Sequence, residues 1–94
     1  MSAFLIGHIT IRNLDKWNEY RGKVPSTLEP WGAKLIFRGK LSDVLVGGHD
    51  HTDTVVMQFP DQDALKGWYT SRAYQALVPL RTEAATMVLL SFDE

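Results

Sequence analysis

Two side chains in this sequence are suited to acid–base chemistry on a small molecule: His8 and Arg38. An imidazole titrates near neutral pH and can act as a general base. A guanidinium can hold a carboxylate or an enolate through two parallel hydrogen bonds, and it stabilises negative charge where that charge develops. The pair therefore predicts proton transfer next to a carbonyl. The alternatives are a histidine hydrogen-bonded across a sheet and an arginine in an inter-subunit ion pair.

Strand alternation gathers further polar side chains beside these two, because alternate residues of a strand share one face of a sheet. In each expected strand the more uniformly apolar set should pack on the helices. The mixed set would line a small-molecule cleft on the other face. That set comprises His8, Thr10, Arg38, Thr54 and Gln58.

The second half of the chain adds aromatic and basic groups to an amphipathic helical pattern. Trp68, Tyr69 and Tyr74 could orient a ligand, or they could be packing groups whose polar atoms are satisfied. Arg81 falls on the face that should be buried with Tyr74. A buried guanidinium needs a carboxylate, a cluster of carbonyls or a bound anion. We therefore treat all four as candidate substrate contacts, beside their structural alternatives.

His49 and His51 stand on a polar loop with aspartates at positions 50 and 53. Alternate histidines and carboxylates are suitable ligands for zinc, iron or nickel. The sequence places no third ligand, however, and two glycines directly before the histidines favour a flexible turn. We assign no metal and no cofactor to the chain.

Composition limits the class of protein. The 94 residues suit one domain, spanning 1–94, with a modest core. Ten basic and eleven acidic residues almost cancel, and no basic run indicates a nucleic-acid partner. Without cysteine there is no disulfide, thiol nucleophile or zinc-thiolate site. No apolar run reaches membrane-spanning length, and the start lacks the features of a signal peptide. We expect a soluble, cytoplasmic protein that binds neither nucleic acid nor membrane.

The elements that must position these residues follow from periodicity and capping residues. The first half of the chain should form a strand over 4–11, a helix from Asn13 to Gly32 with a kink or two consecutive helical pieces at Pro25, and a strand over 34–40 that continues over 43–46 after an irregularity near Gly39. The second half should form a strand over 53–59, a helix from Asp61 that restarts at Ser71 and runs through Ala85 with a kink at Pro79, and a strand over 86–92. This β-α-β-β-α-β order predicts an α+β, ferredoxin-like fold with a four-stranded antiparallel sheet.

The expected sheet is apolar on both faces, although two helices can cover only one of them. An uncovered apolar face of that size on a monomer would be an exposed patch. A second copy packed against it about a two-fold axis removes the exposure. We therefore expect a homodimer through the sheet face.

The sequence also resembles the family called domain of unknown function 1330, in the dimeric α+β barrel superfamily. The resemblance spans nearly the whole chain and rests on Lys34–Gly39, Val55–Pro60, Trp68–Ser71 with Tyr74–Gln75, and Arg81 with Ala84–Ala85. It implies a ferredoxin-like subunit that forms a two-fold dimer whose sheets enclose a barrel. It implies no single reaction, since the superfamily includes cofactor-free monooxygenases, isomerases, haem-handling proteins and non-catalytic ligand binders.

Two functions remain as hypotheses. The first is a cofactor-free enzyme in which His8 is the base and Arg38 stabilises an enolate formed from a small organic acid. The second is a dimeric binding or accessory module without chemistry, which collects an apolar or aromatic ligand while Arg38 and Arg81 serve the dimer. The sequence leaves open whether the protein is an enzyme.

Overall fold

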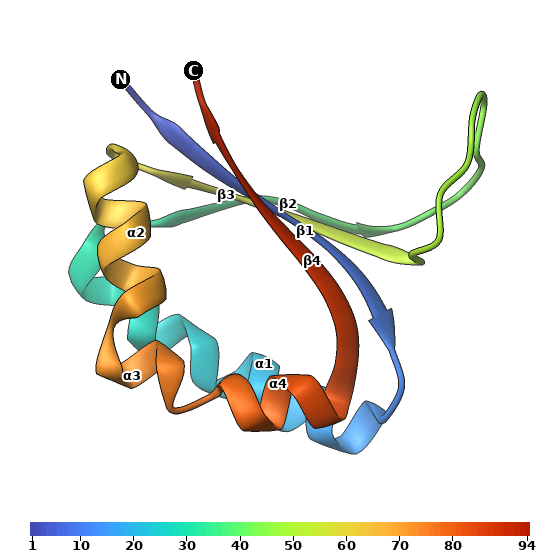
Figure 1. The fold of residues 1–94 in the computed structure, drawn as a ribbon, viewed down its shortest axis with the longest axis horizontal. Coiled ribbons are helices and arrows are strands. Elements are labelled where there is room, and N and C mark those ends of the chain that lie inside the picture. The colour runs from blue at the N-terminus through green and yellow to red at the C-terminus, as the bar shows by residue number, and fades with distance from the viewer.

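The computed structural model describes all 94 residues as one four-stranded sheet with helices on one side (Figure 1). The elements are β1 (Ala3–Ile11), α1 (Leu14–Leu28), a short 3-10 helix (Glu29–Trp31), β2 (Lys34–Lys40), β3 (Asp53–Phe59), α2 (Gln62–Thr70), α3 (Arg72–Gln75), α4 (Val78–Ala84) and β4 (Ala85–Asp93). All neighbouring strands are antiparallel, in the order β2-β3-β1-β4. The predicted ferredoxin-like α+β fold is confirmed.

The helix α1 begins where the sequence predicts, since the Asn13 side chain accepts a hydrogen bond from the Lys16 amide at 3.1 Å. The chain stays helical through Pro25, so α1 is not divided into two pieces there. The helix changes instead to 3-10 geometry around Pro30 and ends at Gly32, whose φ of 69° is in the left-handed region that favours glycine.

The later helices begin at two predicted caps, and a proline opens the last of them. The side chain of Asp61 accepts from the Ala64 amide at 2.8 Å, and that of Ser71 accepts from the Tyr74 amide at 3.2 Å. The predicted single helix from Ser71 is interrupted after α3. Pro79 lies in the first turn of α4, where its missing N–H removes no intrahelical bond. Pro79 therefore starts a helix instead of kinking one.

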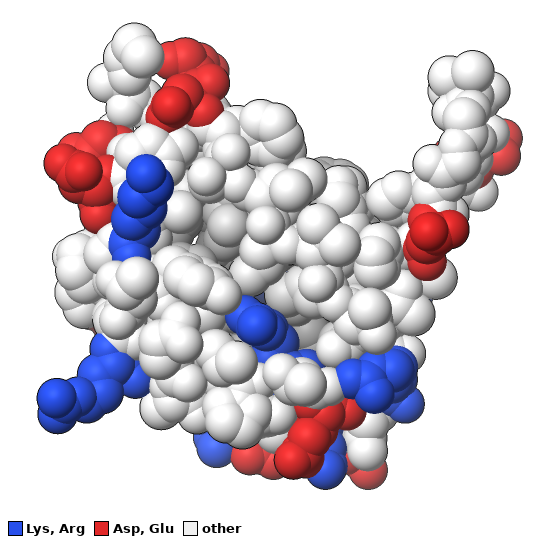
Figure 2. All heavy atoms as spheres, viewed as in Figure 1, with Lys and Arg blue, Asp and Glu red and all other residues white.

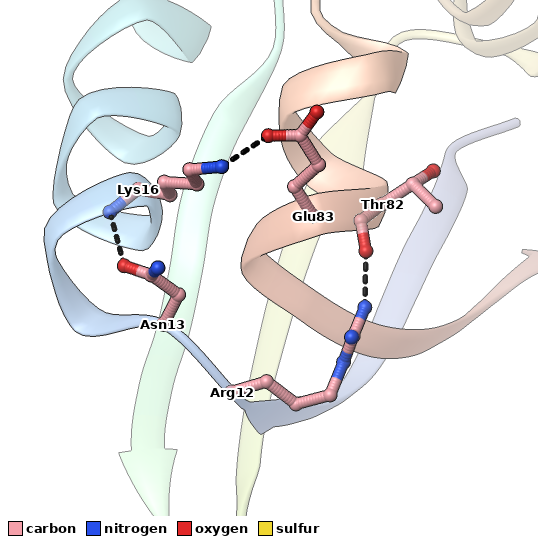
Figure 3. A network of polar contacts seen from close by, with 5 residues as sticks. All are labelled: Arg12, Asn13, Lys16, Thr82 and Glu83. Atoms are coloured by element: carbon pink, nitrogen blue, oxygen red, sulfur yellow. Dashed lines mark hydrogen bonds and ion pairs between the residues drawn. The ribbon is translucent and has the colours of Figure 1, made fainter.

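Polar contacts join the start of α1 to the end of α4 (Figure 3). The Arg12 guanidinium donates to the carbonyl of Thr82, and to that of Ala85 at 3.3 Å. Beside it, Lys16 forms an ion pair with Glu83. Because these contacts connect residues about seventy positions apart, they hold the two helices together below one end of the sheet.

The core lies between the helices and the sheet. Phe59, Trp68 and Tyr74 are its largest fully buried side chains. The Trp68 indole N–H donates to the Thr27 hydroxyl at 3.0 Å, and that hydroxyl donates to the Val24 carbonyl at 2.7 Å. The buried hydroxyl of Thr27 is thus both a donor and an acceptor, as expected of a buried polar group.

No helix covers the other face of the sheet, which we call the open face. Strand register assigns to it Phe4, Ile6, His8, Thr10, Phe37, Thr54, Val56, Gln58, Thr86, Val88, Leu90 and Phe92. This face is apolar along most of its length, and Phe37 and Phe92 are about half exposed on it, at 53% and 47%.

A bulge in β2 changes which of its side chains face the helices. Leu35 stands opposite Met57, whereas Phe37 stands opposite Val56, so Ile36 is an extra residue between them. Beyond the bulge the alternation is inverted. Arg38 therefore faces the helices, and the prediction that it shares a face with His8 is wrong. The irregularity falls at residue 36, not near Gly39 as predicted.

Residues 41–52 form an arm between β2 and β3 that extends away from the sheet (Figure 1). The predicted continuation of the strand over 43–46 is wrong, although that segment is apolar. No neighbouring strand is available there, and Leu45 and Val46 are each 92% exposed. The arm closes at its base, where the Thr52 amide donates to the Ile9 carbonyl at 3.1 Å.

Candidate functional site

A cavity of about 470 Å³ lies between the helices and the sheet. Trp17 and Tyr20 of α1 and Trp68 and Tyr74 of the later helices contribute aromatic walls. The sheet supplies mostly aliphatic side chains. The volume is in the range that accommodates a small organic ligand, and the lining favours a ligand with an apolar or aromatic body.

Two arginines stand at the rim of this cavity, Arg38 on β2 and Arg21 on α1. Neither guanidinium has a carboxylate within 4.0 Å, since the ion pairs of the chain are Lys16–Glu83, Lys23–Glu19 and Lys40–Asp53. Partial burial lowers the pKa of Arg38, and the like charge of Arg21 adds to the effect. Two cations that line one cavity without an ion-pair partner favour the binding of an anion there.

Hydrogen-bonded phenols form part of the cavity wall and account for the half-buried Arg81. The hydroxyls of Tyr20 and Tyr74 lie 2.8 Å apart, and Arg81 donates to the Tyr74 hydroxyl at 2.9 Å. Burial raises the pKa of Tyr20, so its phenol stays neutral. Burial lowers the pKa of Arg81, but the phenols of Tyr74, Tyr69 and Tyr20 together outweigh it, so the pKa is raised. Arg81 fixes Tyr74 and does not itself line the cavity.

The remaining predicted contacts divide between cavity and surface. Trp68 lines the cavity with Tyr74, whereas Tyr69 is 37% exposed and borders a separate depression of about 240 Å³. Gln58 donates to the Ser2 hydroxyl at 2.8 Å on the open face. Thr54 contributes to the cavity lining, although its hydroxyl lies 3.0 Å from Nδ1 of His8.

The structure separates the two residues predicted to share one substrate. His8 and Thr10 lie on the open face, whereas Arg38 lies at the cavity on the opposite face. Partial burial lowers the pKa of His8, and the nearby His49 and His51 lower it further. His8 is therefore a neutral imidazole near pH 7, but it is on the wrong side of the sheet to act on a ligand in the cavity.

Sequence reasoning missed Arg21, although its position carried a usable signal. It stands four residues after Trp17, and residues with that spacing are neighbours on a helix. Arg21 therefore borders the apolar stripe of α1, and it lies at the edge of the cavity that this stripe covers.

Charged side chains on the surface gather at the periphery of the molecule, over the helices and along the arm, while the sheet between them carries few in this view (Figure 2). None of the helices is both long and apolar enough to span a membrane.

The antiparallel sheet, its one-sided helical layer and the open cavity between them define the class: an α+β, ferredoxin-like subunit with a ligand-sized cavity. The chain belongs to the family described as domain of unknown function (DUF1330), whose model matches residues 2–94. No curated protein matches the chain.

Solved structures show the same fold. A protein of unknown function from Rhodopseudomonas palustris, RPA0582, has a TM-score of 0.84 at 15% identity, over 99% of this chain and 82% of its own. A dimeric ferredoxin-like protein of unknown function from Jannaschia sp. has a TM-score of 0.79 at 10% identity, over 100% of both chains. SnoaB, a cofactor-independent oxygenase from Streptomyces nogalater, has a TM-score of 0.72 at 8% identity, over 99% of this chain and 92% of its own. At these identities the likeness is one of fold alone.

Proposed function

We propose that the cavity between the sheet and the helices binds a small organic anion with an aromatic or apolar body. The observation that carries the proposal is the pair of arginines, Arg21 and Arg38, which line a mostly apolar cavity and have no carboxylate within 4.0 Å. The other charged groups in the lining are Glu29 and the ion pair Lys40–Asp53. A carboxylate or enolate would neutralise the rim, and the ring or chain of the ligand would occupy the aromatic interior.

The two parts of such a ligand contribute in different ways. Apolar surface removed from water contributes about 25 cal/mol per Å². The anionic group contributes less, because both arginines are largely exposed to solvent and exposed ion pairs are worth about 0.2–1 kcal/mol each. The cavity interior therefore supplies most of the affinity, and the two arginines together supply the preference for a negative charge.

The three tryptophans provide a direct test by NMR. Trp17 and Trp68 line the cavity and Trp31 does not, so Trp31 serves as an internal control. Titration with naphthoate should shift the indole signals of Trp17 and Trp68 more than that of Trp31. Arg38→Gln should weaken binding, whereas Arg72→Gln, which removes the same charge from the exposed surface of α3, should not. Equal shifts at all three indoles, or equal effects of the two variants, would contradict the proposal.

Catalysis is the second candidate, since the same arginines could stabilise an enolate oxyanion formed without a cofactor. Its specific support is the likeness in fold to SnoaB, a cofactor-independent oxygenase. His8 is not the base in this version, because it lies on the open face. A keto acid incubated with the protein in D₂O should then gain deuterium next to the carbonyl. No exchange above the rate in buffer would leave binding as the function.

The open face supports the homodimer that the sequence predicts. Val88 and Leu90 are exposed there at 42% and 39%, next to half-buried Ile6 and Val56. Two of the structural relatives are described as dimeric. Sedimentation equilibrium should show a dimer that Leu90→Asp dissociates, whereas Leu14→Asp, on an exposed position of α1, should stay dimeric. A dimer that tolerates Leu90→Asp would place the interface elsewhere.

A further inference from the structure

All three histidines of the chain meet at one place. His8 comes from β1, and His49 and His51 come from the end of the arm that returns to β3. The ring centroids of His8 and His49 are 4.9 Å apart, and those of His49 and His51 are 5.9 Å apart. The loop histidines lacked a third partner in the sequence, and the fold supplies it from β1.

Two of these imidazoles are oriented by threonine hydroxyls on the sheet. Nδ1 of His8 lies 3.0 Å from the hydroxyl of Thr54, and Nδ1 of His51 lies 2.9 Å from that of Thr10. When Nδ1 of each ring donates to its threonine, Nε2 of each ring keeps its lone pair. A histidine that binds a metal through one ring nitrogen usually donates the N–H of its other ring nitrogen to an oxygen acceptor, which fixes the orientation of the ring.

We propose that His8, His49 and His51 form a binding site for a divalent transition-metal ion of the zinc, nickel or copper group. With metal–nitrogen bonds of about 2.0–2.1 Å, imidazole centroids around one tetrahedral ion lie about 5 Å apart, which is close to the spacings found here. Neutral imidazole is a favoured ligand of these ions. Three protein ligands leave one position for water or a further group.

Binding requires one local movement. In this structure no group of three or more ligating side chains is arranged to hold a metal ion. His49 is exposed on the arm directly after Gly47 and Gly48, so its ring can turn without disturbing the core. His8 and His51 would stay on their threonines while His49 turns its donor nitrogen toward them.

The test uses untagged protein stripped of metal with a chelator, because a histidine tag would add competing imidazoles. Calorimetric titration with Zn²⁺, and optical titration with Co²⁺, should show one ion bound per chain. His49→Gln and His51→Gln should each weaken binding at least about ten-fold. Thr54→Val, which removes only the support of His8, should weaken it by roughly 10–100-fold. Asp43→Asn, on the same arm, should bind like the wild type.

Further outcomes decide the proposal. Nitrogen-15 NMR of the histidine rings should show coordination through Nε2 of His8 and His51. Absence of binding tighter than millimolar, or equal binding by the wild type and His49→Gln, would overturn the assignment. Arg38→Gln should leave metal binding unchanged, because the histidines and the cavity lie on opposite faces of the sheet. The metal site and the proposed anion site can therefore fail independently.

Discussion

The Tyr74→Phe substitution tests whether the hydroxyl network, and not aromatic packing alone, joins Arg81 to the phenols of the cavity wall. Tyr74 is fully buried, and its ring packs on Trp68 with centroids 4.2 Å apart, a contact that phenylalanine keeps. The loss is confined to two hydrogen bonds, to Tyr20 at 2.8 Å and from Arg81 at 2.9 Å. A neutral bond is worth about 0.5–1.5 kcal/mol and a bond to a charged group about 1.5–3 kcal/mol. We expect the free energy of unfolding to fall by about 2–4 kcal/mol.

The assay is urea unfolding followed by tryptophan fluorescence, at one protein concentration because a dimer makes stability concentration-dependent. Tyr20→Phe is the matched control, since it removes only the bond between the two phenols and should cost about 1 kcal/mol. A Tyr74→Phe protein that is no less stable than Tyr20→Phe would refute the reasoning. Arg81 would then owe its position to something other than the phenol.

Three further predictions concern helices and pH. Gly22→Ala should stabilise α1 by about 0.5–1 kcal/mol, because no atom lies within 4 Å of the added Cβ. Gly67→Ala should instead destabilise α2, because its Cβ would lie 2.5 Å from the Trp31 ring. Urea unfolding of both variants measures the contrast, and effects of the same sign would contradict it. Asn13→Ala should cost about 1 kcal/mol in the same assay through loss of the α1 cap, and an unchanged midpoint would contradict it. The pKa of His8 in the folded protein lies below its ordinary value of 6.5, so the unfolded chain binds the proton more tightly. The free energy of unfolding of the metal-free protein should therefore fall as the pH drops from about 7 toward that lowered pKa. His8→Gln should flatten this fall, and an unchanged slope would contradict the prediction.

The order of elements could be predicted because each helix start carries a local signal. Asn13, Asp61 and Ser71 cap the helices that they were expected to cap. Gly32 ends the first helical segment in the conformation that glycine favours. These preferences act over a few residues, and here tertiary structure agrees with them.

The strand faces could be predicted only where the alternation is unbroken. In β1 and β3 it holds, and His8, Thr54 and Gln58 lie on the face expected for them. In β2 the extra residue Ile36 inverts the face of Arg38. Nothing in the composition of that strand identifies the bulge, because its position depends on pairing with β3, far away in the sequence.

The candidate site was predictable in its residue types more than in its arrangement. Arg38, Trp68 and Tyr74 do border one cavity, but that cavity lies under the helices and not on the open face. Arg81 could be recognised as a cation on the inward face of its helix, yet it is only half-buried and its partner is a phenol instead of a carboxylate. His8 lies beside His49 and His51 because of the path by which the arm returns to the sheet next to β1. No local sequence pattern encodes that path.

The most direct test of an anion site in the cavity compares naphthoate with its neutral isostere naphthamide. Calorimetry on the wild type should show that the carboxylate binds about five-fold more tightly, since the two exposed arginines together contribute on the order of 1 kcal/mol. In the Arg21→Gln, Arg38→Gln double variant the two compounds should bind equally, with the affinity for the amide unchanged. A preference for the carboxylate that survives in the double variant would contradict the account.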